Sequence, residues 1–345
     1  MTLREEVTLR EKVIRRFAAL LLAALCFGAP ARSQEPVRTQ PSPARSQPGP
    51  ARQDDNIIRV NVRLVHMLVT IKDAAGQLVG SLNKDDFTVY DNGVKQDIAV
   101  FDRETEQPLS VAMLVDTSAS TGIELRYELD SVSRFLKVLL AEGNPDDTVA
   151  LYSFNQDVRL LSSYTRRFAR VDQMLKQLKS DGGTSVYDAL FLASPELEYR
   201  SGRHVMVLVT DGGDTTSVKD FHQALEAVQL ADAILYPILV VPIKNDAGRN
   251  VGGENALSTL AAGTGGHVFT PTLGAQLDGA FDDILRELRT QYLIGFYPKD
   301  VPPTKDRFHA LKVTVQSTSA NRGLRVTTRS GYYGESNESR SGLGR

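Results

Sequence analysis

The sequence predicts an α/β domain with a doubly wound, mostly parallel sheet, inserted between two β segments that pair into a small β-sandwich. From residue 110 to about residue 290, short and wholly apolar runs alternate with stretches of helical periodicity, which is typical of a parallel sheet covered on both faces. On either side, residues 57–101 and 292–328 show the alternating apolar pattern of antiparallel strands. Insertion of the α/β domain between two halves of one sandwich explains this order most simply.

The first 33 residues predict a signal peptide for export. Arg15 and Arg16 precede an apolar run over residues 17–27, and small residues follow it, so that cleavage is expected after Ala31 or Ser33. The run is too short to span a bilayer, and no stable membrane insertion is expected after cleavage. An uncleaved amphipathic anchor or a buried helix is the alternative.

Residues 34–55 and 334–345 have the composition of disordered segments. Residues 34–55 are rich in Gln, Pro, Ser and Arg and contain almost no large apolar side chains, so they cannot bury enough surface to offset the entropy of ordering. We therefore expect a flexible linker after the signal peptide and a disordered tail at residues 334–345.

The charge of the chain argues against a nucleic-acid-binding protein, and its cysteine content argues against a disulfide-stabilised protein or a thiol enzyme. Forty basic and 42 acidic residues give a net charge of -2, and they form no basic field of the kind that nucleic-acid binding requires. The only cysteine, Cys26, lies in the predicted signal peptide, so the mature chain has no disulfide and no thiol nucleophile. Leu25 disfavours lipid modification of Cys26, because such sites need a small residue at that position.

The two β segments are predicted at residues 56–106 and 291–333. In the first, apolar residues alternate over residues 60–71, and turns are indicated at 73–76 and 91–93. In the second, strands are expected at residues 292–297, 309–315 and 324–328.

The α/β domain is predicted to span residues 107–290. Its buried strands are expected at residues 111–115, 149–152, 205–209 and 234–241. One apolar stripe at helical spacing identifies an amphipathic helix, and its members are Leu125, Leu129, Val132, Leu136 and Leu139. Gly263-Thr-Gly-Gly266 follows a helical stretch and is interpreted as a helix end and not as a dinucleotide-binding loop.

Hydroxyl and carboxyl side chains follow the predicted strands where each strand ends. Asp116, Ser118 and Ser120 come after the first strand, Thr184 lies in a glycine loop, and Asp211 ends the third strand. Ligands of open α/β sheets bind at this edge. Hard oxygen donors of low total charge suit Mg²⁺, with Mn²⁺ or Ca²⁺ as alternatives. The sequence therefore predicts a five-residue metal site.

Each part of this pattern also has a purely structural explanation. Asp and Ser after a strand often cap the next helix, and Gly-Gly-Thr often forms only a turn. Asp188 and Asp214 are interpreted in this structural way and are left out of the ligand set. His66, His204, His222, His267 and His309 are scattered singly and lack the spacing of a zinc-binding helix.

Asp116-x-Ser118-x-Ser120, Gly-Gly-Thr184 and Thr-Asp211-Gly together resemble the metal-ion-dependent adhesion site of von Willebrand factor A domains. The resemblance implies that Asp116, Ser118 and Ser120 ligate directly, that Thr184 ligates or lies close, and that Asp211 acts directly or through water. It also implies that a partner's carboxylate completes the coordination. Including residues 85–98 and 329–333, the chain further resembles the exported VWFA-related family described from Acidobacteria.

These patterns predict a binding module and no enzyme. A divalent cation would bridge to an acidic group on a protein partner, outside the cytoplasm, whether in the periplasm, at the cell surface or secreted. One alternative is a structural cell-envelope protein in which the metal only stabilises loops. Another is a Mg²⁺-dependent hydrolase or phosphotransferase with Asp116 as nucleophile, which the serine at position 118 disfavours, because aspartyl-phosphate enzymes need a further acid there.

Overall fold

The structure is a computed structural model that describes residues 64–334 except 104–106, 123, 241–249, 303, 306 and 317–322. The predicted signal peptide, the linker at residues 34–55 and the tail beyond residue 334 lie outside the described residues. The chain divides into two units, Met1–Arg59 and Val60–Arg345, and every described residue belongs to the second. No helix among the described residues is long and apolar enough to cross a membrane.

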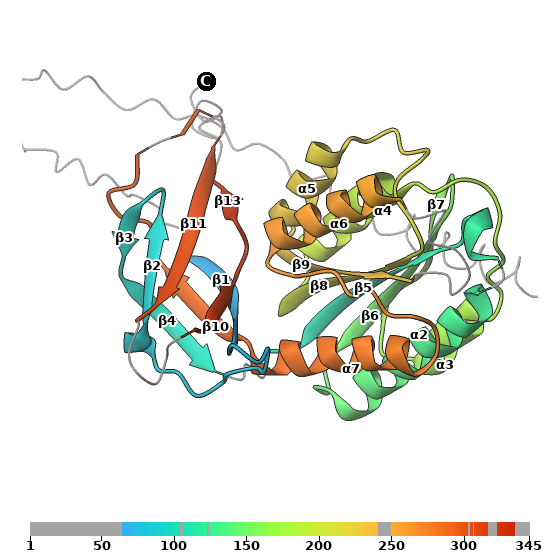
Figure 1. Cartoon of the computed structure of the whole chain (residues 1–345), viewed down its shortest axis with the longest axis horizontal. Helices are drawn as coiled ribbons and strands as arrows, with labels where there is room; N and C mark the ends of the chain where they lie inside the picture. Colours follow the sequence, from blue (N-terminus) through green and yellow to red (C-terminus); the bar gives the residue numbers. More distant parts are fainter. Residues whose placement is uncertain are drawn as a thin grey trace, which may run out of the picture. The chain divides into compact units, whose positions relative to one another are not determined.

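A five-stranded sheet forms the centre of the α/β part, in the order β7-β6-β5-β8-β9 (Figure 1). Its strands are β5 (Leu109–Asp116), β6 (Thr148–Phe154), β7 (Val158–Thr165), β8 (Arg203–Thr210) and β9 (Ala233–Leu239). Four of them are parallel, and only the edge strand β7 runs antiparallel to its neighbour β6. The predicted mostly parallel, doubly wound sheet is therefore confirmed.

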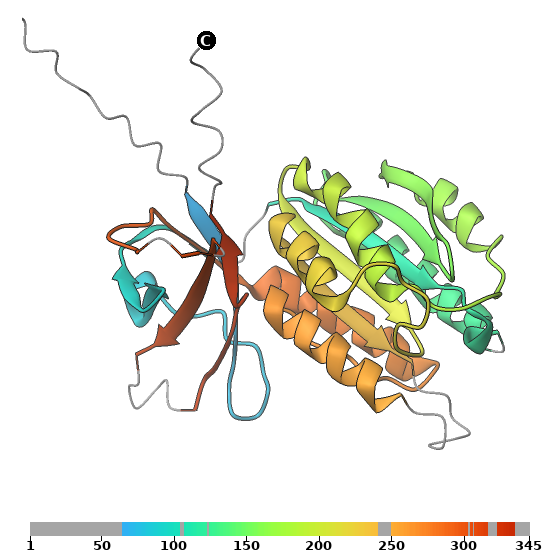
Figure 2. The ribbon, with the colours of Figure 1, turned by 90° about the horizontal axis from the view of Figure 1, so that it is seen from above.

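Helices cover both faces of this sheet (Figures 1 and 2). One face carries α2 (Leu125–Glu142), α3 (Phe168–Leu175) and α7 (Ala275–Thr290). The other carries α4 (Val186–Glu198), α5 (Phe221–Leu230) and α6 (Val251–Thr264). Helix α6 ends at Gly265, whose φ of 90° suits glycine, so the predicted helix end at residues 263–266 is confirmed.

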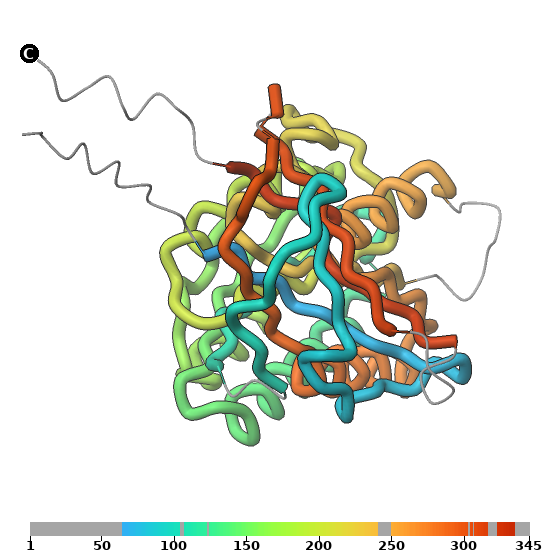
Figure 3. The backbone as a smooth tube through the Cα atoms, turned by 90° about the vertical axis from the view of Figure 1, so that its left-hand side faces the viewer, coloured from blue at the N-terminus to red at the C-terminus, as the bar shows by residue number. Residues whose placement is uncertain are grey.

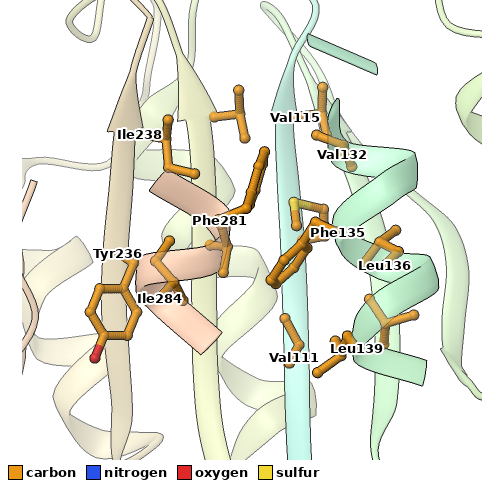
Figure 4. Packing of buried hydrophobic residues seen from close by; sticks show 14 of the residues in the cluster. Val111, Val115, Val132, Phe135, Leu136, Leu139, Tyr236, Ile238, Phe281 and Ile284 are labelled. Atoms are coloured by element: carbon orange, nitrogen blue, oxygen red, sulfur yellow. The ribbon is translucent and has the colours of Figure 1, made fainter. Parts of the chain in front are cut away.

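The middle strand β5 supplies both hydrophobic cores. Val111, Met113 and Val115 belong to the core under α2 and α7, whereas Ala112 and Leu114 belong to the core under α4 and α5. This division follows from the alternation of side chains along a strand. Figure 4 shows the first core, in which residues of α2 and α7 meet over β5.

The buried side of α2 differs from the predicted stripe at one position. Four of the five predicted residues are buried, namely Leu125, Val132, Leu136 and Leu139. Leu129 is only partly buried, and the side chain of Glu128 is fully buried instead. Steps of three and four from Leu125 reach position 128 as well as 129, and in the packed helix the former is the fully buried one. A carboxyl group therefore lies where an apolar side chain is expected.

The two β segments form two four-stranded sheets that share one core. One sheet has the order β12-β1-β10-β4 and the other β13-β11-β2-β3. The N-terminal strands are β1 (Val65–Lys72), β2 (Phe87–Asp91), β3 (Val94–Gln96) and β4 (Ile98–Arg103). The C-terminal strands are β10 (Tyr292–Phe296), β11 (Phe308–Val315), β12 (Arg325–Thr327) and β13 (Gly331–Tyr333).

Strands far apart in the sequence pair directly in both sheets. Val65 pairs with Phe296 across β1 and β10, and Val89 pairs with Val313 across β2 and β11 (Figure 3). Residues from all four of these strands form a single hydrophobic cluster. The prediction that the α/β part is inserted between two halves of one sandwich is therefore confirmed.

Tight turns set the register of the first β segment. Between β2 and β3, Asn92 and Gly93 have φ values of 47° and 82°, which the two central residues of a hairpin turn require. A second turn after β1 is closed by Gly76, whose N–H donates to the carbonyl of Asp73. Both turns lie where the sequence predicts them.

A buried polar cluster joins the last helix of the α/β part to strand β1. Glu287 on α7 accepts hydrogen bonds from Tyr236 (2.9 Å) and Thr70 (3.3 Å) and pairs with Lys72 at 2.8 Å. Gln291, between α7 and β10, donates to Thr70 and Tyr236. These bonds satisfy a carboxylate that is only 2% exposed and fix the point where the chain leaves α7 for the sandwich.

Candidate functional site

Asp116 ends β5 and is completely buried. Its Oδ1 accepts a hydrogen bond from the backbone N–H of Ser118 at 2.8 Å, and its Oδ2 accepts one from the Thr210 hydroxyl at 2.6 Å. Thr210 is the last residue of the neighbouring strand β8. Thr210 and Asp116 are 94 positions apart in the sequence. They meet because parallel strands end at the same edge of the sheet.

Ser118 and Ser120 lie in the turn after β5 and connect Asp116 to Asp211. The two serine Oγ atoms are 3.0 Å apart, and the Ser120 hydroxyl donates to Asp211 Oδ1 at 3.0 Å. Ser118 is buried, whereas Ser120 is exposed. The four side chains thus form a row of oxygens that begins inside the domain and ends at its surface.

Thr184 reaches the same edge because its loop is bound to the turn after β5. The N–H of Ala119 donates to the Gly182 carbonyl at 3.0 Å, and the N–H of Asp181 donates to the Thr117 carbonyl at 2.8 Å. Gly182 has a φ of 76°, which favours glycine. Within the described part of the chain, no hydrogen bond joins the Thr184 side chain to the other four predicted ligands.

Asp188 and Asp214 connect loops, as the sequence predicts for them. Asp188 accepts the backbone N–H groups of Val218 and Lys219 at 3.0 and 2.8 Å. Asp214 accepts the N–H of Tyr187 at 3.2 Å. Both carboxylates therefore fix the loop between β8 and α5 against the start of α4, and neither is directed at the row of oxygens by a hydrogen bond.

Burial makes the carboxylates of the site costly to ionise. It raises the pKa of Asp116 to about 6, although the bonds from Thr210 and Ser118 lower it in part. Burial also raises the pKa of Asp211, against the bond from Ser120. A cation beside these groups would stabilise their charged forms and offset that cost.

The donor set fits a hard divalent cation. It consists of two carboxylates and three hydroxyls. The Asp116 and Asp211 carboxylates already accept hydrogen bonds, and each has further oxygen lone pairs with which to bind a cation. Mg²⁺ prefers such oxygens and retains several waters. No group of three His, Cys, Asp or Glu residues able to hold a metal occurs among the described residues.

Two buried polar residues outside the predicted ligand set were not identified from the sequence. Thr210 orients Asp116, and its position directly before Asp211 was the available indication. Glu128 lies in the first turn of α2 and is fully buried. Its position on the apolar side of the helix, three residues after Leu125, was the indication in that case.

Replacing Thr210 with valine is expected to destabilise the metal-free chain by about 1.5–3 kcal/mol at neutral pH. The reason is that the buried, charged carboxylate of Asp116 loses the hydrogen bond from the Thr210 hydroxyl. Urea unfolding in EDTA measures the effect. Thr210→Ser keeps the hydroxyl and is expected to lose less than half as much. Equal losses in the two variants would show that the hydrogen bond contributes nothing.

The part of the chain that carries these strand ends matches one known domain family. Residues 111–213 match the family model described as von Willebrand factor type A domain. The match runs from β5 to the loop after β8 and includes all five predicted ligands. The α/β part of the chain is called the A-type domain below. The narrower resemblance to the VWFA-related family of Acidobacteria stays a prediction.

Several solved structures are similar to this chain. The von Willebrand factor domain of the type V pili tip protein Mfa5 from Porphyromonas gingivalis has a TM-score of 0.44 at 18% identity and covers 52% of this chain and 94% of that one. A von Willebrand factor type A protein from Catenulispora acidiphila has a TM-score of 0.45 at 11% identity, over 79% and 74%. BatB from Bacteroides thetaiotaomicron has a TM-score of 0.41 at 17% identity, over 52% and 98%. No curated protein matches the chain.

Proposed function

We propose that the A-type domain is a metal-dependent binding module that captures an acidic group of a protein partner. Asp116, Ser118, Ser120, Thr184 and Asp211 would hold one divalent cation, most simply Mg²⁺. The bound cation supplies a positive charge at the sheet edge, to which a carboxylate of the partner is attracted. The chain would act after export, in the periplasm, at the cell surface or outside the cell.

The observation that carries this proposal is the row of oxygens from buried Asp116 to exposed Ser120. Hydrogen bonds of 2.8–3.0 Å fix the Asp116, Ser118 and Asp211 side chains, so these side chains lose little conformational freedom when a cation binds. Because the row reaches the surface at Ser120, a cation held there would be accessible to another protein.

Two other functions are less well supported. A structural role for the cation predicts stabilisation of the loops without capture of any carboxylate. An enzymatic role with Asp116 as nucleophile lacks the additional acid two residues later, where Ser118 stands. Neither of Asp116's hydrogen-bonded neighbours, Ser118 and Thr210, is a general base.

The proposal is tested with an acidic probe. An immobilised glutamate-rich peptide is expected to retain the chain in millimolar Mg²⁺ and to release it in EDTA, whereas the glutamine-rich counterpart is expected to retain nothing. Asp116→Ala is expected to abolish retention together with the Mg²⁺-dependent rise in melting temperature that follows from binding to the folded state alone.

Asp157→Ala is the matched control, since Asp157 is a carboxylate exposed at 62% in the turn between β6 and β7. It should behave like the wild type in both measurements. A melting temperature that rises with Mg²⁺ without retention on the peptide would support the structural role. No rise for the wild type would contradict the metal site itself.

A further inference from the structure

A cavity of about 250 Å³ is lined by residues of β1, β8, β9 and β10. It borders Arg203, the first residue of β8, and so lies at the end of the sheet opposite the predicted cation site. Its walls include the buried apolar side chains of Met67, Ile234 and Leu293. A cavity of about 150 Å³ already holds a benzene ring. The space is therefore large enough for a small organic molecule with an apolar body.

Arg203 brings a buried cation to this cavity. The residue is only 5% exposed, and its Nη1 donates to the Leu288 carbonyl at 2.5 Å. Its Nε–H is buried and has no hydrogen-bond partner among the described residues. Burial lowers the pKa of Arg203 to about 10, so the group keeps its charge at neutral pH. A buried donor without a partner and a buried charge both cost free energy, and an anion in the cavity would offset both costs.

A second guanidinium lines the same cavity. Arg329, two residues before β13, pairs with Asp232 and donates to the His66 carbonyl. Its Nε–H, like that of Arg203, is buried without a partner in the described part of the chain. The Asp232 carboxylate is shared, because it also lies 3.2 Å from Nε2 of His66. The other acid on the wall, Glu198, is exposed to water. Positive charge therefore prevails in the buried part of the wall.

Arg203 also borders a second cavity, of about 360 Å³, on the side of α2 and α7. Two acids, Glu142 and Asp147, line that space together with Arg203 and Arg289. The acids balance the two arginines there and would repel an anion. Around the first cavity, the lining residues include three arginines and two acids. An anion beside Arg203 is therefore better accommodated in the first cavity.

We propose that the first cavity is a binding site for a small organic carboxylate. One carboxylate oxygen would accept the Nε–H of Arg203, and hydrogen bonds between two charged groups are among the strongest in proteins. Arg329 would add a second positive charge. The apolar side chains of the wall would cover the body of the ligand, as in other small-molecule sites. The site needs no cation, so it would be a function additional to the capture of an acidic group at the opposite end of the sheet.

The proposal is tested by calorimetric titration of the full chain, freed of metal on a chelating resin, with acetate, hexanoate and benzoate. Removing metal matters because a bound cation could itself attract a carboxylate. Hexanoate or benzoate is expected to bind, and acetate more weakly, since it has almost no apolar body. Benzamide has the shape of benzoate without its charge and should bind much more weakly. Failure of all three carboxylates to bind would overturn the inference, and so would equal affinities for benzamide and benzoate.

Arg203→Met is expected to raise the dissociation constant of the bound carboxylate at least about tenfold, because the ligand loses a charge-assisted hydrogen bond. Arg159→Met is the matched control, since Arg159 is a cation exposed at 68% on β7. Neither this variant nor Asp116→Ala, which alters the predicted cation site, should change the affinity. Wild-type affinity in Arg203→Met would overturn the inference and leave the proposed function intact. A loss of affinity in Asp116→Ala would also overturn it, because the carboxylate would then bind at the other end of the sheet.

Arg203→Lys is the second variant, should Arg203→Met fail to fold. It keeps the positive charge and removes the Nε–H, so it is expected to bind the carboxylate several times more weakly than the wild type. Equal affinities in Arg203→Lys and the wild type would overturn the assignment of the ligand to this guanidinium.

Discussion

Raising the pH from about 5 to about 8.5 in EDTA is expected to lower the free energy of unfolding by on the order of 3–5 kcal/mol. The cause is two buried carboxyl groups, that of Asp116 at the end of β5 and that of Glu128 on α2. Burial raises the pKa of Asp116 from 3.8 to about 6 and that of Glu128 from 4.5 to about 8. Each pH unit over which a folded group stays protonated while its unfolded counterpart is ionised corresponds to about 1.4 kcal/mol.

The direction follows from proton binding. Between the unfolded and the folded pKa of each acid, the folded chain binds more protons than the unfolded chain, so stability falls as the pH rises. The contribution of Asp116 is lost as the pH approaches about 6, and that of Glu128 as it approaches about 8. Urea unfolding at a series of pH values measures the loss.

Glu128→Leu is the control for this prediction. The variant lacks the acid with the larger shift, so its stability should change much less between about pH 6 and about pH 8.5. His267 acts in the opposite direction, because burial lowers its pKa, and comparing the two proteins cancels its effect. Parallel pH profiles for wild type and Glu128→Leu would contradict the assignment of the effect to Glu128.

Phe281→Ala is expected to destabilise the A-type domain by about 3–5 kcal/mol. Phe281 on α7 stacks on Phe135 on α2 with ring centroids 4.7 Å apart, and the two side chains are 2% and 3% exposed. Figure 4 shows both rings between the helices and β5. Removing one ring leaves a cavity that two helices held by the sheet cannot close.

Equilibrium unfolding in urea measures this loss. Tyr199→Ala, at a position 86% exposed after α4, removes an aromatic ring from the surface and should change stability by less than about 0.5 kcal/mol. Phe281→Leu should fall between the wild type and Phe281→Ala, since it fills part of the cavity. Similar losses for Phe281→Ala and Tyr199→Ala would contradict the stacked core.

The strands of the central sheet could be predicted because burial on both faces leaves a simple pattern. Val111–Val115 and Val205–Val209 are wholly apolar in the sequence and lie within β5 and β8 in the structure. Strand β7 was not predicted. It is an edge strand with several exposed residues, among them Leu160 at 41%, so its sequence lacks the continuous apolar run of its neighbours.

The site could be predicted in part for a similar reason. Asp116, Ser118 and Ser120 stand at alternate positions within five residues. This Asp-x-Ser-x-Ser spacing after a strand end is recognisable by itself. That the Thr210 hydroxyl reaches Asp116, while Asp211 accepts from Ser120, depends on which side of the strand end each residue faces. Neither composition nor spacing specifies that orientation.

The sequence by itself determined the order of the elements, the insertion of the α/β part and the residue types available for a cation. Those properties follow from local apolar periodicity and turn chemistry, which act over a few residues. Only the tertiary structure decided that Glu128 is fully buried on α2, whereas Leu129 is only partly buried. The rotation of α2 about its axis depends on its packing against β5 and α7, and a difference of one residue turns a helical side chain by about 100°.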